Sequence, residues 1–389
     1  MEHTIGQIRD AVRIHTDRLF DLACDIFDHP ELALGEFYAA QRLTTFLEQE
    51  GFAVERGTGG LETAFRAVWK RGVGGPVIGM MLEYDALEGV GHACGHHLQG
   101  PACIGAALAF RKLVDTDCSL VLYGTPAEEG VSGKVTMAAA GCFRDVDIMF
   151  CFHAGVSSGV GYSNKALQRL EVAFHGVSSH ASTQPHLGRS ALDAALLMFH
   201  ALEIMREHIT DGSRIHYSLM QGTGPSNIIP DYTAVELRLR SGERKYVAEM
   251  TGRVRNIVEG ACLMTGTTAE VKDRGSTENM VTPPTLLKLL LDNEEALGLE
   301  KLWRHQSTSG GSSDVGNVSH IVPLANIYTW FCDGRIHSED WAKEGKTPNA
   351  RRSMETGAEV IAMTALQMVN NPQMLEQIKA ELKHILDTE

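Results

Sequence analysis

Two side chains that can bind a metal ion stand two positions apart in this sequence. They are Cys94 and His96, in the glycine-flanked segment GHACGHH. Thiolate sulfur and imidazole nitrogen suit zinc and neighbouring divalent metals, and in turn or extended backbone this spacing lets both approach one ion. Because the chain contains 17 histidines, one such pair alone is a weak indication of a site.

Three further segments share one plan, in which an apolar run typical of a β-strand leads to a side chain of a metal-binding type. The run SLVLYGTPA leads to Glu128 and Glu129, DIMFCF leads to His153, and ANIYTWFCDGRI leads to His337. In α/β proteins, ligands bind beyond the carboxyl ends of the strands, where several strand-to-helix turns meet. Since the run PVIGMML likewise precedes Cys94, the sequence predicts that four segments build one metal site.

Composition narrows the class of partner. The chain has 35 Lys and Arg against 49 Asp and Glu, a net charge of −14, which argues against nucleic acid or an anionic membrane surface. No stretch approaches the roughly 18 uninterrupted apolar residues of a membrane span, and the start of the sequence has charges where a signal peptide needs an apolar segment. We expect a small-molecule substrate, no nucleic acid, no membrane and a cytoplasmic location.

The eight cysteines lie mostly inside apolar runs. A chain of 389 residues buries enough surface to hold its fold without disulfides. We therefore expect seven of them to be reduced core residues and Cys94 alone to take part in chemistry.

The elements that position these residues divide the chain into three parts. Residues 5–51 predict two amphipathic helices around the turn HPELALGE, and residues 62–163 alternate between strand and helix patterns, as in an α/β fold. After a different middle segment, helix patterns resume. His337 must therefore return to the first part to join its partners.

The middle segment follows the order βαββαβ of a ferredoxin-like unit. Its two helix patterns each place apolar residues along one face: Leu192, Leu196, Phe199, Leu202 and Met205, then Val247, Met250, Val254, Ile257 and Ala261. We predict an inserted domain over residues 165–275, with residues 1–164 and 276–389 forming the α/β domain that carries the metal site.

Motifs in a fixed order extend over essentially the whole chain: EYDAL, GHACGHHLQG, GTPAEEG, the His153 segment, FHGVSSHAS, SNIIPD, GSSDVGNVS and the late His337-Ser338. Together they resemble the co-catalytic metallopeptidase family of aminoacylases, glutamate carboxypeptidases and dipeptidases. The chain is most similar to the branch of amidohydrolases that includes aminobenzoyl-glutamate hydrolase, hippurate hydrolase and the auxin-conjugate hydrolases. The Cys-Gly-His pair and the double Glu mark that branch.

This resemblance implies a metallopeptidase-type α/β domain with an inserted lid that serves in dimerisation, and one or two divalent ions, zinc or manganese, in each subunit. The metal ligands that it implies are Cys94, His96, Glu129, His153 and His337. It also implies Glu128 as general base, Asp85 as an orienting acid, and His180 on the lid as a transition-state residue that reaches across a dimer interface.

The chemistry of amide hydrolysis supports these roles independently. A divalent ion lowers the pKa of its bound water to roughly 7 and polarises the carbonyl. Glu128 can take the proton of that water if Glu129 faces the metal. Two ions roughly 3.5 to 4 Å apart could share the thiolate of Cys94, although the sequence does not establish that both sites are filled.

Several residues are candidates for contact with the substrate. His180 either donates to the developing oxyanion or is a surface histidine. Asn227, in SNIIPD, either contacts the substrate or only forms a turn before Pro230. Gly311 and Ser312, in GGSSDVG, form either a cradle of backbone N–H groups for a substrate carboxylate or a plain loop.

Two histidines near the Cys-Gly-His pair are ambiguous. His97 stands where related sequences commonly have Asp or Asn, and we expect it on the substrate side of the pocket. Either histidine, His92 or His97, could instead donate a hydrogen bond to a metal ligand or merely provide polar lining.

We predict a metal-dependent amidohydrolase that cleaves the C–N amide bond of an N-acyl or N-aroyl amino acid or a dipeptide, and that forms a homodimer or higher homo-oligomer. One alternative on the same scaffold is the removal of an amino group from an aromatic acid. Another is a non-catalytic metal- or peptide-binding relative, against which the intact Glu128 argues. A Cys94 thiol nucleophile is a further alternative, but it would gain nothing from His153 and His337.

Overall fold

The structure is a computed structural model that describes residues 4–160, 162–222, 224–302, 307–308 and 311–388. The chain forms two compact units, which are described separately. Unit 1 contains the described residues of Met1–Tyr162, Val281–Ser307 and Asn317–Thr388, and unit 2 those of Ser163–Met280 and Thr308–Gly316. The short strands β6 (Tyr162–Ser163) and β13 (Ser307–Thr308) lie where the chain crosses between them.

The predicted insertion, residues 165–275, falls inside unit 2, but a second segment joins it. The described residues of 308–316 were expected in the α/β domain, whereas they belong to unit 2. The reason is local: the N–H of Lys165 donates to the carbonyl of Gly311 at 2.9 Å, and Arg240 donates to Ser312 Oγ at 3.0 Å.

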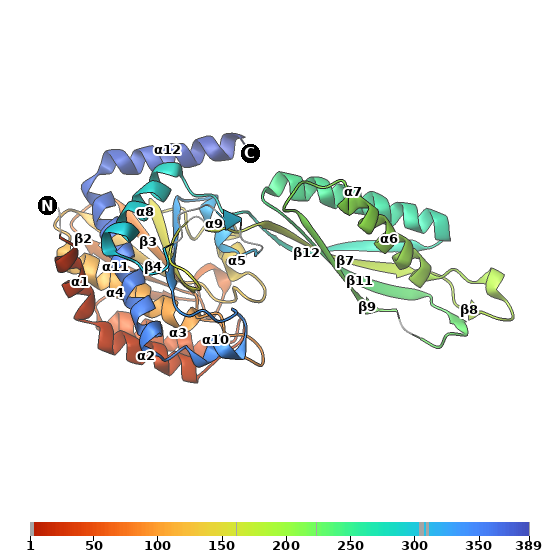
Figure 1. Ribbon diagram of the computed structural model, residues 1–389, viewed down its shortest axis with the longest axis horizontal. Coiled ribbons are helices and arrows are strands. Elements are labelled where there is room, and N and C mark those ends of the chain that lie inside the picture. Colours follow the sequence, from red (N-terminus) through yellow and green to blue (C-terminus); the bar gives the residue numbers. More distant parts are fainter. Residues whose placement is uncertain (1–3, 161, 223, 303–306, 309–310, 389) are drawn as a thin grey trace. The chain divides into compact units, whose positions relative to one another are not determined.

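Unit 1 is built on a six-stranded sheet in the order β1-β2-β4-β3-β5-β14 (Figure 1). Its strands are β1 (Ala53–Arg56), β2 (Phe65–Arg71), β3 (Val77–Leu82), β4 (Cys118–Gly124), β5 (Ile148–Gly155) and β14 (Leu324–Trp330). The neighbours β4, β3, β5 and β14 run parallel, and β2 and β1 add antiparallel strands at one edge. Strands β3 and β4 are buried along nearly their whole length, which explains their continuous apolar sequences.

The helices of unit 1 are α1 (Ile5–Arg13), α2 (Thr16–Asp28), α3 (Phe37–Gln49), α4 (Gln99–Leu113), α5 (Gly133–Ala139), α8 (Pro284–Leu297), α10 (Glu339–Lys343), α11 (Pro348–Asn370) and α12 (Pro372–Thr388). The short helix α9 (Val315–Ser319) spans a unit boundary. Residues 5–51, all of which the structure describes, contain three helices and not the predicted two. The first helical pattern breaks between α1 and α2, and α1 begins with a capping box formed by Thr4 and Gln7.

Helix α4 lies in the centre of unit 1, where α1, α2 and α11 pack against it. Its residues from Gln99 to Phe110 are all buried, so it is apolar around its circumference, as expected of a central helix. Helix α11 also packs closely on β5: a Cβ atom added at Gly357 would lie 2.2 Å from Phe152 Cδ2. This core holds the strand ends described below.

Unit 2 is a four-stranded antiparallel sheet in the order β12-β7-β11-β9, with two helices packed against it. In chain order its main elements are β7 (Ala166–His175), α6 (Ala191–Arg206), β9 (Arg214–Gln221), β11 (Tyr232–Ser241), α7 (Arg244–Thr265) and β12 (Thr268–Thr277), which is the order βαββαβ. A two-stranded ladder of β8 (Ser179–His180) and β10 (Ile228–Ile229) lies outside this sheet.

The helix faces of unit 2 differ in part from the prediction. In α6 the buried residues are Ala191, Ala194, Ala195, Met198, Leu202 and Met205, whereas Leu196 is 54% exposed. The small alanines let α6 approach the sheet, so its core face is rotated relative to the larger apolar residues. In α7, Val258 is buried where Ile257 was expected, and the other residues predicted to face the core are buried.

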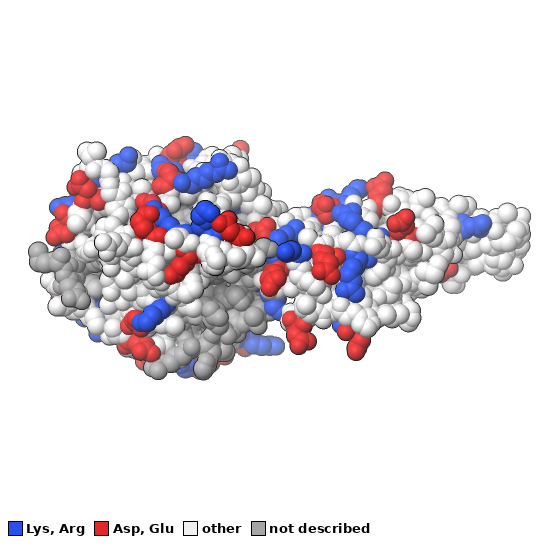
Figure 2. Space-filling view, turned by 90° about the horizontal axis from the view of Figure 1, so that it is seen from above, with Lys and Arg blue, Asp and Glu red and all other residues white. Residues whose placement is uncertain are grey.

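The described surface is mixed in charge. Figure 2 shows acidic and basic side chains interspersed on the face in view, and neither sign forms a continuous field there. Among the described residues, every helix is too short or too polar to cross a bilayer. The eight cysteines are all free of disulfides.

Candidate metal centre

The residues with metal-binding side chains in unit 1 follow four adjacent parallel strands. Because β4, β3, β5 and β14 run in the same direction, their carboxyl ends lie at one edge of the sheet. Cys94 and His96 follow β3, Glu129 follows β4, and His337 follows β14. His153 differs slightly from the expectation, since β5 continues to Gly155 and the histidine lies inside the strand.

These side chains converge. One ligand atom from each of Cys94, His96 and His153 lies within 4.8 Å of the other two, and the same is true of Cys94, Glu129 and His337. Cys94 Sγ is 3.4 Å from His153 Nε2, and His337 Nε2 is 3.1 Å from Glu129 Oε1. Cys94 therefore belongs to both groups of ligand atoms.

Glu128 lies beside this cluster. A carboxylate oxygen of Glu128, one of Glu129 and a ring nitrogen of His96 form a third group within 4.8 Å, and both glutamates are partly exposed. The backbone between β4 and the two glutamates is unusual, because Ala127 has φ of 63°. Left-handed backbone at a residue other than glycine is strained and persists only where its surroundings hold it. Here the N–H of Ala127 donates to Glu36 Oε1 at 2.8 Å.

Two more left-handed residues shape the site. Gly95, between Cys94 and His96, has φ of 93°, and a Cβ there would lie 3.1 Å from Ala154 Cβ. His337 has φ of 64°, and its N–H donates to the carbonyl of Ala93 at 2.9 Å. This hydrogen bond ties the segment after β14 to the loop that carries Cys94 and His96.

Asp85 orients one histidine of the cluster. Its Oδ1 lies 3.0 Å from His96 Nδ1, and its Oδ2 accepts a hydrogen bond from the N–H of Glu129 at 2.8 Å. Because Asp85 contacts Nδ1, the other ring nitrogen of His96, Nε2, faces the cluster. His96 Nε2 is buried and makes no hydrogen bond with any described residue. Histidines that bind metals are typically oriented in this way by a carboxylate or carbonyl on the other ring nitrogen. For His153, the carbonyl of Ala154 has the same role and lies 2.6 Å from Nδ1.

The protonation states of the candidate ligands are mixed, because contacts with Cys94 and Asp85 raise the pKa of His96, whereas the pKa values of Glu129 and His153 are lowered. Burial alone would raise the pKa of Glu129, but the hydrogen bond from His337 and the charge on His96 lower it to about 2. Burial and the nearby His96 lower the pKa of His153, which keeps its imidazole neutral. Burial raises the pKa of the Cys94 thiol, so this residue must give up a proton to bind a cation. One thiolate, one carboxylate and three imidazoles form a donor set that fits zinc or a similar ion.

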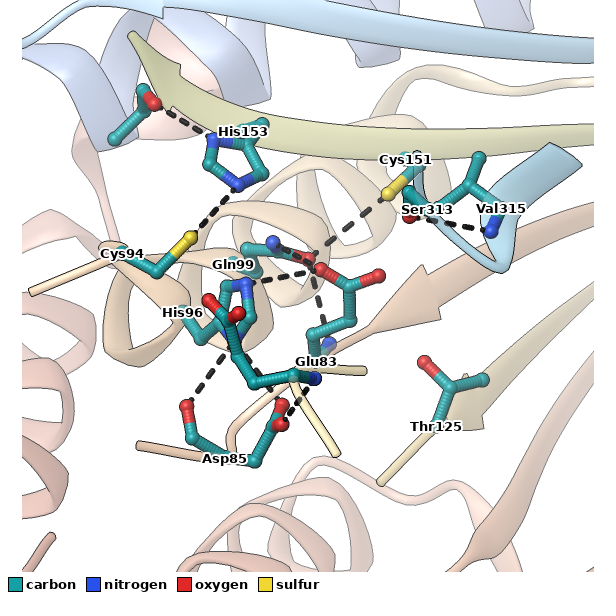
Figure 3. A network of polar contacts seen from close by, with 12 residues as sticks. Glu83, Asp85, Cys94, His96, Gln99, Thr125, Cys151, His153, Ser313 and Val315 are labelled. Atoms are coloured by element: carbon teal, nitrogen blue, oxygen red, sulfur yellow. Dashed lines mark hydrogen bonds and ion pairs between the residues drawn. The ribbon is translucent and has the colours of Figure 1, made fainter. Parts of the chain in front are cut away.

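Beneath the cluster lies a buried polar network that the sequence did not reveal. Lys134 Nζ lies 2.6 Å from Glu83 Oε1. Gln99 Nε2 donates to Glu83 Oε2 at 2.6 Å, as Figure 3 shows. Burial would raise the pKa of Glu83, but the charges on Lys134 and His96 lower it to about 2. Glu83 directly follows β3, so the strand-end rule could have found it. Lys134 does not follow a strand directly, so the strand-end rule does not predict its place in this network.

The two ambiguous histidines lie in the core. His97 is 1% exposed, its Nε2 lies 2.9 Å from the carbonyl of Gly345, and its ring packs edge-on against Phe27. His92 is also buried, and burial together with the charge on His96 lowers its pKa to about 4. His97 was expected on the substrate side of the pocket. It lies in the core instead, because Phe27 and Gly345 enclose its ring.

The remaining candidates belong to unit 2. Antiparallel pairing of β8 and β10 sets Ile228 opposite His180, and the N–H of Ala181 donates to the carbonyl of Asn227 at 2.9 Å. His180 and Asn227 are therefore neighbours, and both are exposed. Gly311 and Ser312 lie in the loop that joins unit 2 through Lys165 and Arg240.

Comparison with known proteins identifies a family and several relatives that this chain resembles. The model of the peptidase family M20/M25/M40 matches residues 79–367. One of the p-aminobenzoyl-glutamate hydrolase polypeptides of Escherichia coli is 30% identical, over 100% of this chain and 97% of the relative. The Xaa-Arg dipeptidase of Mus musculus is 32% identical, over 96% of this chain and 90% of the relative.

Solved structures share the fold. A dinuclear metal-binding peptidase of the M20 family from Bacillus subtilis has a TM-score of 0.73 at 19% identity, covering 92% of this chain and 99% of its own. An aminobenzoyl-glutamate utilization protein from Klebsiella pneumoniae has a TM-score of 0.71 at 19% identity, covering 93% and 98%.

Proposed function

Because the chain belongs to the peptidase family M20/M25/M40, we propose that it is a metal-dependent amidohydrolase that cleaves the amide bond of an N-acyl or N-aroyl amino acid or a dipeptide. One observation carries this proposal. Five side chains with metal-binding groups converge at the ends of four parallel strands, with a further carboxylate, that of Glu128, beside them.

We assign the metal ligands from the two groups of atoms. His96 and His153 would hold one ion, Glu129 and His337 would hold a second, and Cys94 would contact both. The shared position of Cys94 supports this division, since one thiolate can bridge two ions. We propose zinc or manganese as the metal, because imidazole and carboxylate accept both and thiolate favours zinc.

The remaining groups of the site have separate tasks. A bound divalent ion supplies an activated water and polarises the amide carbonyl. Glu128 accepts the proton of the attacking water and passes it to the leaving nitrogen. Glu129, held by its contacts with His337 and Asp85, stays ionised and faces the metal. Asp85 fixes the ring of His96, so that the same nitrogen always faces the cluster.

We propose that unit 2 supplies substrate contacts and the dimer interface. The neighbouring His180 and Asn227 would donate to the oxyanion, and Gly311 and Ser312 would contact the substrate carboxylate. The edge strand β9 supports dimerisation: Tyr217, Leu219 and Met220 are 36%, 41% and 58% exposed. An exposed apolar edge strand is a ready template for pairing with a second chain. Eight free thiols suit a reducing compartment, so we place the protein in the cytoplasm.

The names of the relatives define the first substrates to test. Protein loaded with zinc or manganese should be offered p-aminobenzoyl-glutamate and Xaa-Arg dipeptides, with release of the free amino acid as the readout. Release of ammonia from aminobenzoates would instead support the removal of an aromatic amino group. Stoichiometric metal without turnover of any substrate in a wide panel would support a binding protein.

A further inference from the structure

Lys134 is a fully buried lysine that the proposed mechanism does not use. It lies at the start of α5, its side chain is 0% exposed, and it pairs with Glu83 Oε1 at 2.6 Å. Lysine is almost never fully buried unless it is paired, and removing water from two charges is unfavourable even when they form a pair. An ion pair in this place therefore calls for an explanation beyond stability.

The partner, Glu83, is held at both oxygens. Lys134 forms an ion pair with Oε1, and the side-chain amide of Gln99 donates a hydrogen bond to Oε2 at 2.6 Å. The other end of the same amide, Gln99 Oε1, accepts from the backbone N–H of Glu83 at 3.3 Å. Figure 3 shows Glu83 and Gln99 side by side, next to His96. Two contacts thus fix the carboxylate of Glu83, and a third fixes its backbone.

That carboxylate lies within reach of the proposed metal centre. Glu83 Oε2 is 3.4 Å from His96 Nε2, the ring nitrogen that Asp85 leaves for the metal. A carboxylate so close to a ligand nitrogen is itself a potential ligand. A catalytic metal, in contrast with a structural one, must keep a coordination position open for water or substrate.

We propose that Lys134 is a positioning residue that, together with Gln99, holds Glu83 off the metal and so keeps a coordination position open for the substrate. This inference rests on the proposed function, because it needs a metal at His96. Loss of Lys134 should release Glu83 Oε1, and the freed carboxylate could then bind a metal held at His96.

The test compares metal binding by wild type and Lys134→Met, with cobalt(II) as the probe. Absorption by cobalt in the visible range weakens as the number of its ligands rises. We expect weaker absorption per bound cobalt in Lys134→Met, binding of cobalt at least about tenfold tighter, and a lower kcat. The double variant Glu83→Gln/Lys134→Met lacks the carboxylate charge and should regain the wild-type spectrum.

A purely structural pair predicts the opposite, since loss of a group that supports a metal site typically weakens metal binding by about 10- to 100-fold. Weaker binding of cobalt with an unchanged spectrum in Lys134→Met would therefore overturn the inference. If Lys134→Met does not fold, Gln99→Leu frees the other oxygen of Glu83 and is judged by the same two readouts. Wild-type protein that binds no cobalt would overturn the proposed metal centre, and this inference with it.

Discussion

Asp85 contacts His96 through one carboxylate oxygen, 3.0 Å from Nδ1, and reaches the backbone of the next strand end with the other. Burial alone would raise the pKa of Asp85, but the adjacent His96 lowers it. One ionised side chain therefore fixes both a ring nitrogen of His96 and the position of Glu129. This carboxylate therefore contacts two of the segments that carry the proposed metal ligands.

Replacement of that carboxylate should weaken the metal site without unfolding the protein. In Asp85→Asn, one oxygen becomes an N–H donor, so the two contacts with N–H groups cannot both persist. We expect metal affinity to fall by about 10- to 100-fold, as measured by competition with a chromogenic chelator. Asp145→Asn, which changes an exposed carboxylate paired with Arg66, is the matched control. Equal metal affinity in Asp85→Asn and wild type would contradict the orienting role.

The two adjacent glutamates should respond differently to the same substitution. Glu128→Gln should keep its metal and lower kcat by at least about a hundredfold, because it removes a general base. Glu129→Gln should lose metal, because it removes a proposed ligand. Elemental analysis and steady-state kinetics separate the two effects. The reverse pattern would exchange the two assignments, and two fully active variants would place the site elsewhere.

Metal affinity should rise with pH. Burial raises the pKa of Cys94, so its thiol keeps a proton until a metal displaces it, and each binding event releases that proton. Activity should fall below about pH 6, because protons compete with the metal for its ligands, and chelators should abolish activity reversibly. Calorimetric titration of the metal in two buffers of different ionisation enthalpy measures the proton release. Cys94→Ser should release fewer protons; the same number would show that the thiol is not a ligand.

Glu294 should make the protein less stable as pH rises. It is 0% exposed on α8, neither carboxylate oxygen has a hydrogen-bond partner among the described residues, and burial raises its pKa to about 8. The folded state therefore keeps a proton that the unfolded state loses above about pH 4.5. The free energy of unfolding should fall by up to about 1.4 kcal/mol per pH unit between these two values. Urea titrations from pH 5 to 8 should show this slope, and Glu294→Gln should reduce it; an equal slope would exclude Glu294 as the source.

Two inactive variants should rescue each other if His180 acts across a dimer. After subunit exchange between His180→Ala and Glu128→Gln, each mixed dimer has one site with an intact base and an intact histidine. Random pairing should restore about one quarter of the wild-type activity per site. Exchange confirmed by mass spectrometry without any recovery would mean that His180 acts within its own chain or has no part in catalysis.

Much of the site was predictable because its chemistry follows from local sequence. Cys94 and His96 lie two apart, Glu128 and Glu129 are adjacent, and each follows an apolar strand. Parallel pairing of those strands then brings distant segments together, as the strand-end rule requires. Short patterns were enough to predict that the candidate ligands would gather.

The parts that escaped prediction depend on packing across the fold. His97 is enclosed by Phe27 and Gly345, which are far away in sequence. The burial of Lys134 depends on Glu83, more than fifty positions earlier. Leu196 is exposed because the alanines of α6 allow a closer approach to the sheet. No local periodicity contains this information.

The order in which the strands pair has a consequence for folding. Strand β14 is the parallel neighbour of β5, yet the whole of Ser163–Met280 lies between them in the sequence. During synthesis, a growing chain exposes Cys94, His96, Glu129 and His153 long before His337 emerges. Contacts between such distant segments form late. If these five residues bind the metal as proposed, the complete set of ligands forms only after β14 has paired with β5.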